Sequence, residues 1–382
     1  MLIALNKDKK RVNAQDCIDS NNKTTKYVCP SCKQDLVLKK GTIKIAHFAH
    51  KKKSECISFS EGETEEHLLG KQLLFEMLRK NMQEVYLEAY LSDLKQRPDI
   101  LWKTDEEKIA IEFQCTTLNI RRMKERTSNY KRRGYKVIWI LGKNLHIKNK
   151  LTNLQKTFVG ITDSGIFYSL EFDVSNKMFT VIYNLNSINH SRRIDYKIKS
   201  WPIKSKDNII RFMRNSNGLN FEVNNFPRYN LSIRDNYIRS NAYYSNRATK
   251  LFMEKIYQNR DSLISIPIEC YVTLPCDWMI SSSNMLWKYY LLKFIQLNSK
   301  NEFTTKELKC VWEKLITNKL LILSDFPLVS SDVLDTPLKE FCNFLVKQNI
   351  LKDKGDQVWR INKRPIFYRN ERAKYKQIFL CK

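Results

Sequence analysis

Long apolar runs and acidic side chains are what this sequence of 382 residues has little of. No stretch approaches the roughly 18 consecutive apolar residues that a membrane-spanning helix needs. The first residues also lack the longer apolar segment of a secretory signal. We therefore expect no membrane insertion and a cytoplasmic location. Internal repeats and low-complexity segments are missing as well, so nothing in the sequence indicates a repeat architecture.

The shortage of acidic residues leaves a strong positive charge. The chain has 67 Lys and Arg against 40 Asp and Glu, a formal net charge of +27, which favours a polyanionic partner such as nucleic acid. A general bias towards lysine would explain the total, but not its distribution. Residues 61–112 hold 13 acidic and 7 basic residues, whereas residues 121–150 hold 11 basic residues and one acidic residue. An acidic pocket beside a basic ridge suits a metal site next to a path for phosphates.

Length and cysteine content limit how the chain is organised. A chain of 382 residues, 42% of them hydrophobic, is expected to form two or three domains with real cores. Its ten cysteines are scattered, and in a cytosolic protein this favours free thiols and metal ligands over a disulfide framework.

The most closely spaced cysteines predict a zinc site. Cys29 and Cys32 form a Cys-x-x-Cys pair, which is followed by His47, His50 and Cys56. This spacing is typical of a structural Zn²⁺ site with four tetrahedral ligands. Because His47 and His50 would face opposite sides of a strand, only one of them is expected to bind. We expect the ligands to be Cys29, Cys32, His50 and Cys56, with His47 as the alternative ligand or a DNA-facing group.

The stretch from residue 61 to 142 contains the strongest pattern of secondary structure. After an acidic start, apolar residues spaced by three and four predict a helix over residues 61–80. Short apolar segments then predict buried strands. The strands are expected at residues 85–91, beside Asp99, at 109–114 and at 136–141, with a basic helix at 121–135.

Acidic side chains of this stretch are expected to meet at one edge of a sheet. A strand period of two places Glu112 and Gln114 on one face, with Asp99 on or beside the neighbouring strand. The helix presents Glu66 and His67 by its spacing of three and four. Three carboxylates, Asp99, Glu112 and Glu66, that converge with no cation nearby would repel one another. A divalent ion such as Mg²⁺ resolves that repulsion, polarises a phosphate and activates water.

These residues resemble two known patterns. Pro98-Asp99 followed by Glu112-x-Gln114 resembles the PD-(D/E)xK nuclease motif, in which a Pro-Asp pair and an acidic-x-Lys strand form the metal site. The wider set resembles the competence protein CoiA family, closely over residues 1 to about 160 and loosely beyond. The residues that carry this resemblance are Gly62 to His67, Lys71, Arg97 to Asp99, Ile111 to Gln114, Arg126, Tyr130, Gly134 and Trp139 to Leu141.

The resemblance implies roles for individual residues. Asp99 and Glu112 would hold Mg²⁺ or Mn²⁺, Glu66 would complete the site, and His67 would act as a base or metal partner. Gln114 stands where the nuclease motif has lysine. Since its amide carries no charge, it would orient water rather than stabilise a charged phosphate.

Basic residues of the same region complete the expected site. Lys71 lies one helical turn beyond His67 and would substitute for the missing lysine if its helix leans over the sheet edge. Arg126 and Tyr130 share a helix face, where they either pack the helix or contact phosphate. The residues expected to contact DNA are Arg121, Arg122, Arg126, Tyr130, Arg132 and Arg133.

The expected fold is an α+β multidomain arrangement. The order α-β-β-β-α-β is the one that a restriction-endonuclease-like α/β core requires. A hairpin at residues 165–183 either extends that sheet or stands apart. We expect a β-rich zinc-finger-like module at 1–58, a nuclease-like core at 59–160, a β-hairpin extension at 161–200 and a mainly helical domain at 201–382.

The second half of the chain gives weaker signals. Residues 197–248 are expected to form a linker with anchoring aromatics, and the alternative is base stacking by those aromatics. They are Trp201, Tyr229, Tyr237, Tyr243 and Tyr244. Helices are expected at residues 248–257, 285–297, 304–320 and 337–347. The last helix with the segment after it resembles the recognition helix and wing of a winged helix, and the alternative is a docking domain for a partner protein.

Two functions are consistent with these observations. The resemblance to CoiA implies action on incoming single-stranded DNA during natural transformation, with a recombinase or other transformation proteins as partners and metal-dependent cleavage by the nuclease-like core. The alternative is a non-cleaving recombination mediator that grips DNA and recruits a recombinase.

Overall fold

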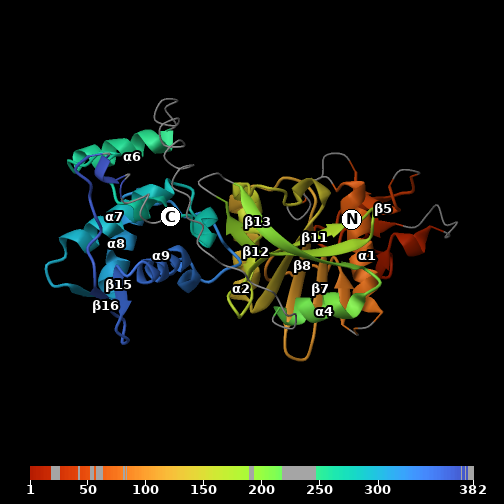
Figure 1. The fold of residues 1–382 in the computed structure, drawn as a ribbon. Coiled ribbons are helices and arrows are strands. Elements are labelled where there is room, and N and C mark those ends of the chain that lie inside the picture. Colours follow the sequence, from red (N-terminus) through yellow and green to blue (C-terminus); the bar gives the residue numbers. More distant parts are fainter. Residues whose placement is uncertain are drawn as a thin grey trace.

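The computed structural model describes residues 1–18, 26–41, 44–51, 56, 63–80, 82, 84–188, 193–216, 247–370, 372–374 and 376. They form a small β-rich unit at the N-terminus, a central sheet covered by helices, and a mainly helical C-terminal unit (Figure 1). The expected mixture of α and β structure, in this order along the chain, is confirmed. None of the helices in these ranges has the length and apolar character needed to cross a membrane.

The N-terminal unit is a five-stranded antiparallel sheet with the order β2-β1-β3-β4-β5. Its strands are β1 (Ile3–Leu5), β2 (Arg11–Asn13), β3 (Tyr27–Val28), β4 (Asp35–Lys39) and β5 (His47–His50). Tyr27 and Phe48 pack with ring centroids 4.8 Å apart in a small core that also contains Cys29 and Cys56. Such a small core alone buries little apolar surface, so a further cross-link would stabilise this unit.

The central sheet has the strand order β13-β12-β11-β9-β8-β7-β6, and β10 pairs with β11. Strands β8, β9 and β11 are mutually parallel in that order, and the other pairs are antiparallel. The strands are β6 (Val85–Leu87), β7 (Ile100–Lys103), β8 (Lys108–Gln114), β9 (Tyr135–Leu141), β10 (Gly160–Ile161), β11 (Phe167–Asp173), β12 (Met178–Ser187) and β13 (Ile194–Pro202).

Helices cover both faces of this sheet. Strand alternation sends Ile111 and Phe113 of β8 into the core under α1 (Glu65–Arg79) and α4 (Lys206–Arg214). The opposite face packs under α2 (Ile120–Arg132) and α3 (Asn153–Thr157), where Met123 meets Trp139 and Phe158. The order α1-β6-β7-β8-α2-β9 is the order that the sequence predicted.

Residues 165–188 and 193–214 belong to the central sheet and the helix that covers it. The hairpin of β11 and β12 extends the central sheet, because Glu171 of β11 pairs with Leu141 of β9. Residues 194–214 are not a linker: they form β13, which contains Trp201, and α4, whose apolar residues are buried in the same core. The other aromatics of the expected linker, Tyr229, Tyr237, Tyr243 and Tyr244, lie outside the described residues, and so does the alternative that they stack on bases.

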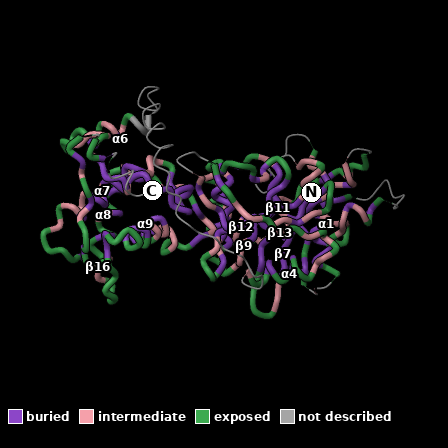
Figure 2. Tube along the Cα trace, viewed as in Figure 1, coloured by how far each residue is buried: buried purple, intermediate pink, exposed green. Residues whose placement is uncertain are grey.

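The C-terminal unit has one large core. Its elements are α6 (Arg247–Gln258), α7 (Asn284–Leu297), β14 (Glu302–Thr304), α8 (Thr305–Thr317), α9 (Thr336–Lys347), β15 (Leu351–Asp353) and β16 (Val358–Ile361). Thr304 and Glu307 form the expected capping box at the start of α8. Buried residues fill the interior of this unit as they fill the central sheet (Figure 2).

The central and C-terminal units are packed against each other. Trp278 donates from its indole N–H to the Leu185 carbonyl oxygen, 3.0 Å away, and its ring meets Phe167 of β11 edge-on. Lys124 of α2 pairs with Asp325, with Nζ and Oδ1 2.6 Å apart. A mixed core formed by both units surrounds Trp278.

Candidate functional site

A fully buried lysine organises the acidic residues beside α1. Lys71 is 1% exposed, and its Nζ lies 2.5 Å from Glu63 Oε1, 2.7 Å from Glu88 Oε1 and 3.4 Å from Asp99 Oδ1. Burial would lower the pKa of Lys71, but these carboxylates raise it well above its usual range. The lysine therefore stays charged and does not act as a base.

Glycine at position 70 lets α1 approach the sheet this closely. A Cβ atom at Gly70 would lie 2.1 Å from the ring of Phe113 on β8. Because no larger residue fits there, α1 can press onto β8 and bring His67 and Lys71 to Asp99. Helix α1 therefore lies directly over this part of the sheet.

Glu88 is a member of this network that the sequence did not suggest. Its side chain is 1% exposed and accepts hydrogen bonds from the backbone N–H groups of Leu2 and Ile3, at 3.0 and 3.2 Å. Burial would raise the pKa of Glu88, but Lys71 and Arg97 lower it to about 2. Glu88 also has a φ of 50°, in the left-handed region, so β6 ends at Leu87 instead of continuing to residue 91 as expected.

Asp99 lies where β7 begins and faces α1. Its Oδ2 is 3.1 Å from Nε2 of His67 and accepts a hydrogen bond from the backbone N–H of Phe113 at 2.9 Å. Burial alone would raise the pKa of Asp99, but His67, Lys71 and the Phe113 N–H hold it well below its usual range. Asp99 is therefore ionised at neutral pH and has cationic or hydrogen-bonding neighbours on both oxygens.

Glu112 is held on the other face of the sheet. Its Oε1 accepts hydrogen bonds from Arg126 Nη2 at 2.5 Å and from the Tyr130 hydroxyl at 2.7 Å, both on α2. The guanidinium of Arg126 also lies 5.6 Å from the ring centroid of Trp139. Burial raises the pKa of Glu112, and Arg126 offsets only part of that effect.

The remaining candidates have their own partners. Glu66 Oε1 accepts a hydrogen bond from the backbone N–H of Lys143 at 2.7 Å, and the Gln114 amide donates to the Thr116 carbonyl oxygen at 3.0 Å. The expectation that the carboxylates lack a nearby cation does not hold, because Lys71 contacts Asp99 and Arg126 contacts Glu112.

In this arrangement Asp99, Glu112 and Glu66 do not form the ligand set of one divalent ion. Across the described part of the chain, a single group of three or more His, Cys, Asp or Glu side chains has its ligand atoms within 4.8 Å of one another, and it lies in the N-terminal unit.

That group is Cys29, Cys32, His50 and Cys56, the four residues favoured by the spacing. Cys29 and Cys56 are buried, and Cys32 Sγ lies 3.3 Å from His50 Nε2. Tetrahedral ligands of a Zn²⁺ ion stand about 3.8 Å apart. The three thiols and the imidazole, whose ligand atoms all lie within 4.8 Å of one another, are close enough to bind such an ion with small adjustments. Burial, together with Cys56 and Cys29, raises the pKa of Cys32 to about 11, so a bound cation would have to displace protons.

His47 lies outside this group. Its Nδ1 is 2.9 Å from the Ile45 carbonyl oxygen, and burial lowers its pKa. Of the two histidines that the sequence left open, the geometry favours His50.

The basic residues of α2 fall into two classes. Arg121, Arg132 and Arg133 are exposed and Arg122 is half-buried, so these side chains can reach a phosphate. Arg126 and Tyr130 were also expected at the DNA. The structure instead places Tyr130 fully in the core and pairs both residues with Glu112, which favours the packing alternative for this pair.

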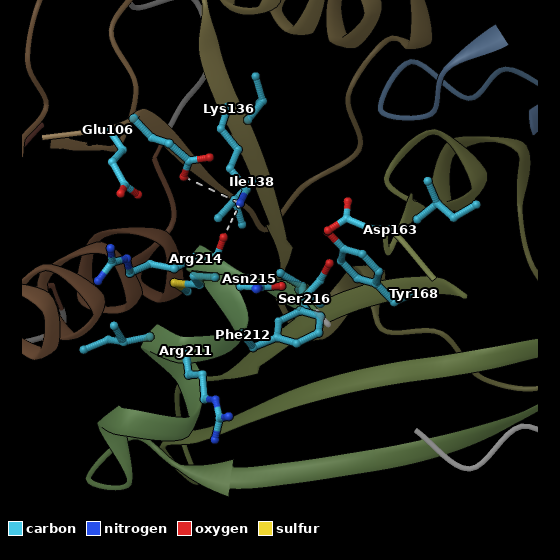
Figure 3. Close-up of a pocket in the computed structure, with 16 residues that line it drawn as sticks. Glu106, Lys136, Ile138, Asp163, Tyr168, Arg211, Phe212, Arg214, Asn215 and Ser216 are labelled. Carbon is cyan, nitrogen blue, oxygen red and sulfur yellow. Dashed lines mark hydrogen bonds and ion pairs between the residues drawn. The ribbon is translucent and has the colours of Figure 1, made fainter. Parts of the chain in front are cut away.

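A separate hollow of about 740 Å³ opens at the other end of the parallel strands. Nζ of Lys136 on β9 lies 3.7 Å from Glu107 Oε2 and donates to the carbonyl oxygen of Arg214 at 2.6 Å. Figure 3 shows Lys136 and Arg214 in the wall of this hollow. Tyr168 and Phe212 form its apolar wall, with ring centroids 5.1 Å apart. None of the expected site residues lines this hollow, and its mixed charges do not form a phosphate track.

Comparisons with known proteins cover nearly all of the chain. Family models match for the N-terminal domain of competence protein CoiA over residues 10–59, its nuclease-like domain over 63–212 and its C-terminal domain over 231–374. The competence protein CoiA of Bacillus subtilis (strain 168) is 25% identical over 354 residues, which is 89% of this chain and 91% of that protein. No solved structure matches the chain. The resemblance seen in the sequence is confirmed, and the chain belongs to the competence protein CoiA family.

Proposed function

We propose that the protein acts in the cytoplasm on single-stranded DNA that enters the cell during natural transformation, and that it promotes recombination of that DNA. The family is named for competence and its central domain for a nuclease. The net charge of +27 and the exposed arginines of α2 support a polyanionic partner. A recombinase or another transformation protein is the partner that would receive the DNA.

In this proposal the protein binds single-stranded DNA without cleaving it. The observation that carries it is that the candidate metal-binding carboxylates are already paired within the central domain. Lys71 forms an ion pair with Asp99, and Arg126 and Tyr130 bind Glu112 by an ion pair and a hydrogen bond. Gln114 offers no positive charge to a phosphate, and its amide is engaged by Thr116. The nuclease-like fold would then serve to hold DNA.

Cleavage is the second candidate, and one observation favours it. Ile100 of β7 pairs with Ile111 of β8, so Asp99, which directly precedes β7, lies beside the strand that carries Glu112, an arrangement similar to the PD-(D/E)xK pattern. A bound Mg²⁺ or Mn²⁺ would polarise a phosphate and activate water. For this, Asp99 and Glu112 would first have to give up their contacts with Lys71 and Arg126.

We further propose that Cys29, Cys32, His50 and Cys56 hold a structural Zn²⁺ ion. The ion would tie the loop after β3 to β5 and to the segment that carries Cys56, which offsets the small size of that core.

The decisive experiment compares DNA binding and cleavage by the full chain. Labelled single-stranded DNA is incubated with the wild type, with Asp99→Asn and with Asp105→Asn, an exposed acidic residue outside the network, with and without Mg²⁺ or Mn²⁺. We expect metal-independent binding and no products with any of the three proteins.

Two results would change the proposal. Products formed by the wild type and by Asp105→Asn, but lost in Asp99→Asn, would establish the cleavage candidate in place of binding alone. Failure of the wild type to bind single-stranded DNA would overturn both candidates.

A further inference from the structure

The end of the C-terminal unit has the chain order of a helix pair followed by a β-hairpin. Helix α7 leads into β14, α8, α9, β15 and β16, and the sheet order β14-β16-β15 places the last strand between the other two. This is the arrangement in which helix-turn-helix proteins with a wing present their second helix. Here α8 and α9 are separated by a longer connection, part of which packs on α2 through Asp325.

Helix α9 has one buried and one open face. Leu338, Phe341 and Leu345 belong to the core of the unit. The exposed residues are Lys339, Asn343, Val346 and Lys347. Their spacing of four, three and one places them on one face, so α9 presents a single narrow stripe to the outside.

The chemistry of this stripe suits the major groove. A side-chain amide can pair with an adenine edge, a small apolar group can meet a thymine methyl, and lysines reach guanine or phosphates. Asn343 and Val346 supply the first two groups between Lys339 and Lys347. Lys339 pairs with Asp335 at 2.7 Å and donates to the Asp332 carbonyl oxygen at 3.3 Å, and its side chain is 59% exposed.

The hairpin next to α9 adds basic side chains. Lys352 of β15 and Arg360 of β16 are directly opposite each other, and both are exposed. The turn between the strands carries Lys354 and passes through Gly355 at a φ of 80°. From α9 to residue 363, six exposed residues are basic and two are acidic, so this surface complements a phosphate backbone. The basic residues are Lys339, Lys347, Lys352, Lys354, Arg360 and Lys363.

We propose that α9 and the β15–β16 hairpin form a binding surface for duplex DNA, with the exposed face of α9 in the major groove and the hairpin along the adjacent backbone. This surface goes beyond the proposed action on single-stranded DNA and does not use the nuclease-like domain. The protein would then bind duplex DNA on this surface and the incoming single strand elsewhere in the chain.

The test measures binding of the full chain to a short labelled duplex and to one of its strands by fluorescence anisotropy. The double variant Lys339→Glu/Lys347→Glu reverses two charges on the stripe. We expect it to weaken duplex binding about tenfold or more at moderate salt and to leave single-strand binding unchanged. Because two phosphate contacts are lost, the slope of log affinity against log salt should fall by about two.

A matched control reverses two charges on α6. Lys250→Glu/Lys255→Glu changes the net charge equally, and Figure 1 shows α6 at the end of the unit opposite the hairpin. The milder variant Lys339→Gln/Lys347→Gln guards against misfolding, and its thermal unfolding should match that of the wild type. Equal duplex binding by the stripe variants and the control would overturn the proposal, as would an equal loss of single-strand binding. The cleavage test at Asp99 is unaffected by either result.

Discussion

At the scale of single residues, the main feature of the nuclease-like domain is one buried lysine shared by three carboxylates, of which Glu88 is buried and Glu63 and Asp99 are half-buried. Replacing Lys71 by Ala leaves Glu63, Glu88 and Asp99 without their common cation. An uncompensated buried charge costs about 3–5 kcal/mol, so we expect the free energy of unfolding to fall by about that amount. Urea unfolding followed by circular dichroism measures the change.

The control for this variant is Lys80→Ala, which removes an exposed lysine at the end of the same helix. We expect a change within about 0.5 kcal/mol for that substitution. If Lys71→Ala unfolds at the same urea concentration as the control, the ion pairs of Lys71 do not contribute to the free energy of unfolding, and the prediction is wrong.

Acid sensitivity should follow from Glu88. Its pKa is about 2 in the folded chain and 4.5 in an unfolded one, so the ionised form stabilises the fold. This contribution is complete above pH 4.5 and is lost as the pH falls towards 2. Glu88→Gln should therefore show a smaller decrease in stability between pH 4.5 and 2 than the wild type, measured as the unfolding midpoint at each pH. An equal decrease in both proteins would show that Glu88 does not carry the effect.

The sequence predicted some of these residues and could not predict others. Helix periodicity correctly placed His67 and Lys71 on one face of α1, and that face meets Asp99. Glu88 was missed because its role depends on a left-handed backbone conformation and on backbone N–H groups more than 80 residues away in the chain. The spacing of Arg126 and Tyr130 predicted a shared helix face, but not that Glu112 would lie beneath it.

At the scale of secondary-structure elements, the proposed Zn²⁺ site would stabilise the N-terminal sheet. We expect about one Zn²⁺ per purified chain, and strongly reduced zinc in Cys29→Ser and in Cys56→Ser, because three ligands hold the ion less tightly than four. Elemental analysis after dialysis measures the zinc content.

Two control substitutions test whether the zinc content depends on the four cluster residues alone. His47→Ala and Cys17→Ser change residues of the same unit outside the cluster, so both proteins should keep the metal. Loss of zinc in His47→Ala with retention in His50→Ala would exchange the roles of the two histidines.

Elements were predictable where their pattern is local. The capping box of α8 and the apolar spacing of α1 and α9 predicted those helices to within a few residues. Strand β13 was taken for a linker because it is an edge strand, and most of its side chains are exposed or half-buried and polar. The apolar residues Ile209, Ile210, Phe212 and Met213 have helical spacing and were the available signal for α4.

At the scale of the whole molecule, the sequence did not reveal that the central and C-terminal units share a core. Residues that touch across this junction are far apart in the chain: Leu185 and Phe167 lie on the central sheet, whereas Trp278 and Phe326 come from the C-terminal unit. No periodicity encodes such a contact. The junction packs the C-terminal unit directly against the nuclease-like domain through this shared core.

Trp278 is the residue that tests this junction. It is 6% exposed, donates to the Leu185 carbonyl oxygen and stacks edge-on with Phe167 and Phe326, at centroid distances of 5.2 and 5.5 Å. Trp278→Ala removes these contacts, at a cost of about 3–5 kcal/mol for a buried aromatic. We expect scanning calorimetry to show one cooperative transition for the wild type and two separated transitions for the variant.

The control is Trp359→Ala, because Trp359 packs against the C-terminal core, where its indole N–H donates to Thr305. Because the contacts of Trp278 persist in that variant, it should still unfold in one transition, at a lower temperature than the wild type. A single transition at the wild-type temperature in Trp278→Ala would mean that other contacts couple the two units, such as the ion pair between Lys124 of α2 and Asp325.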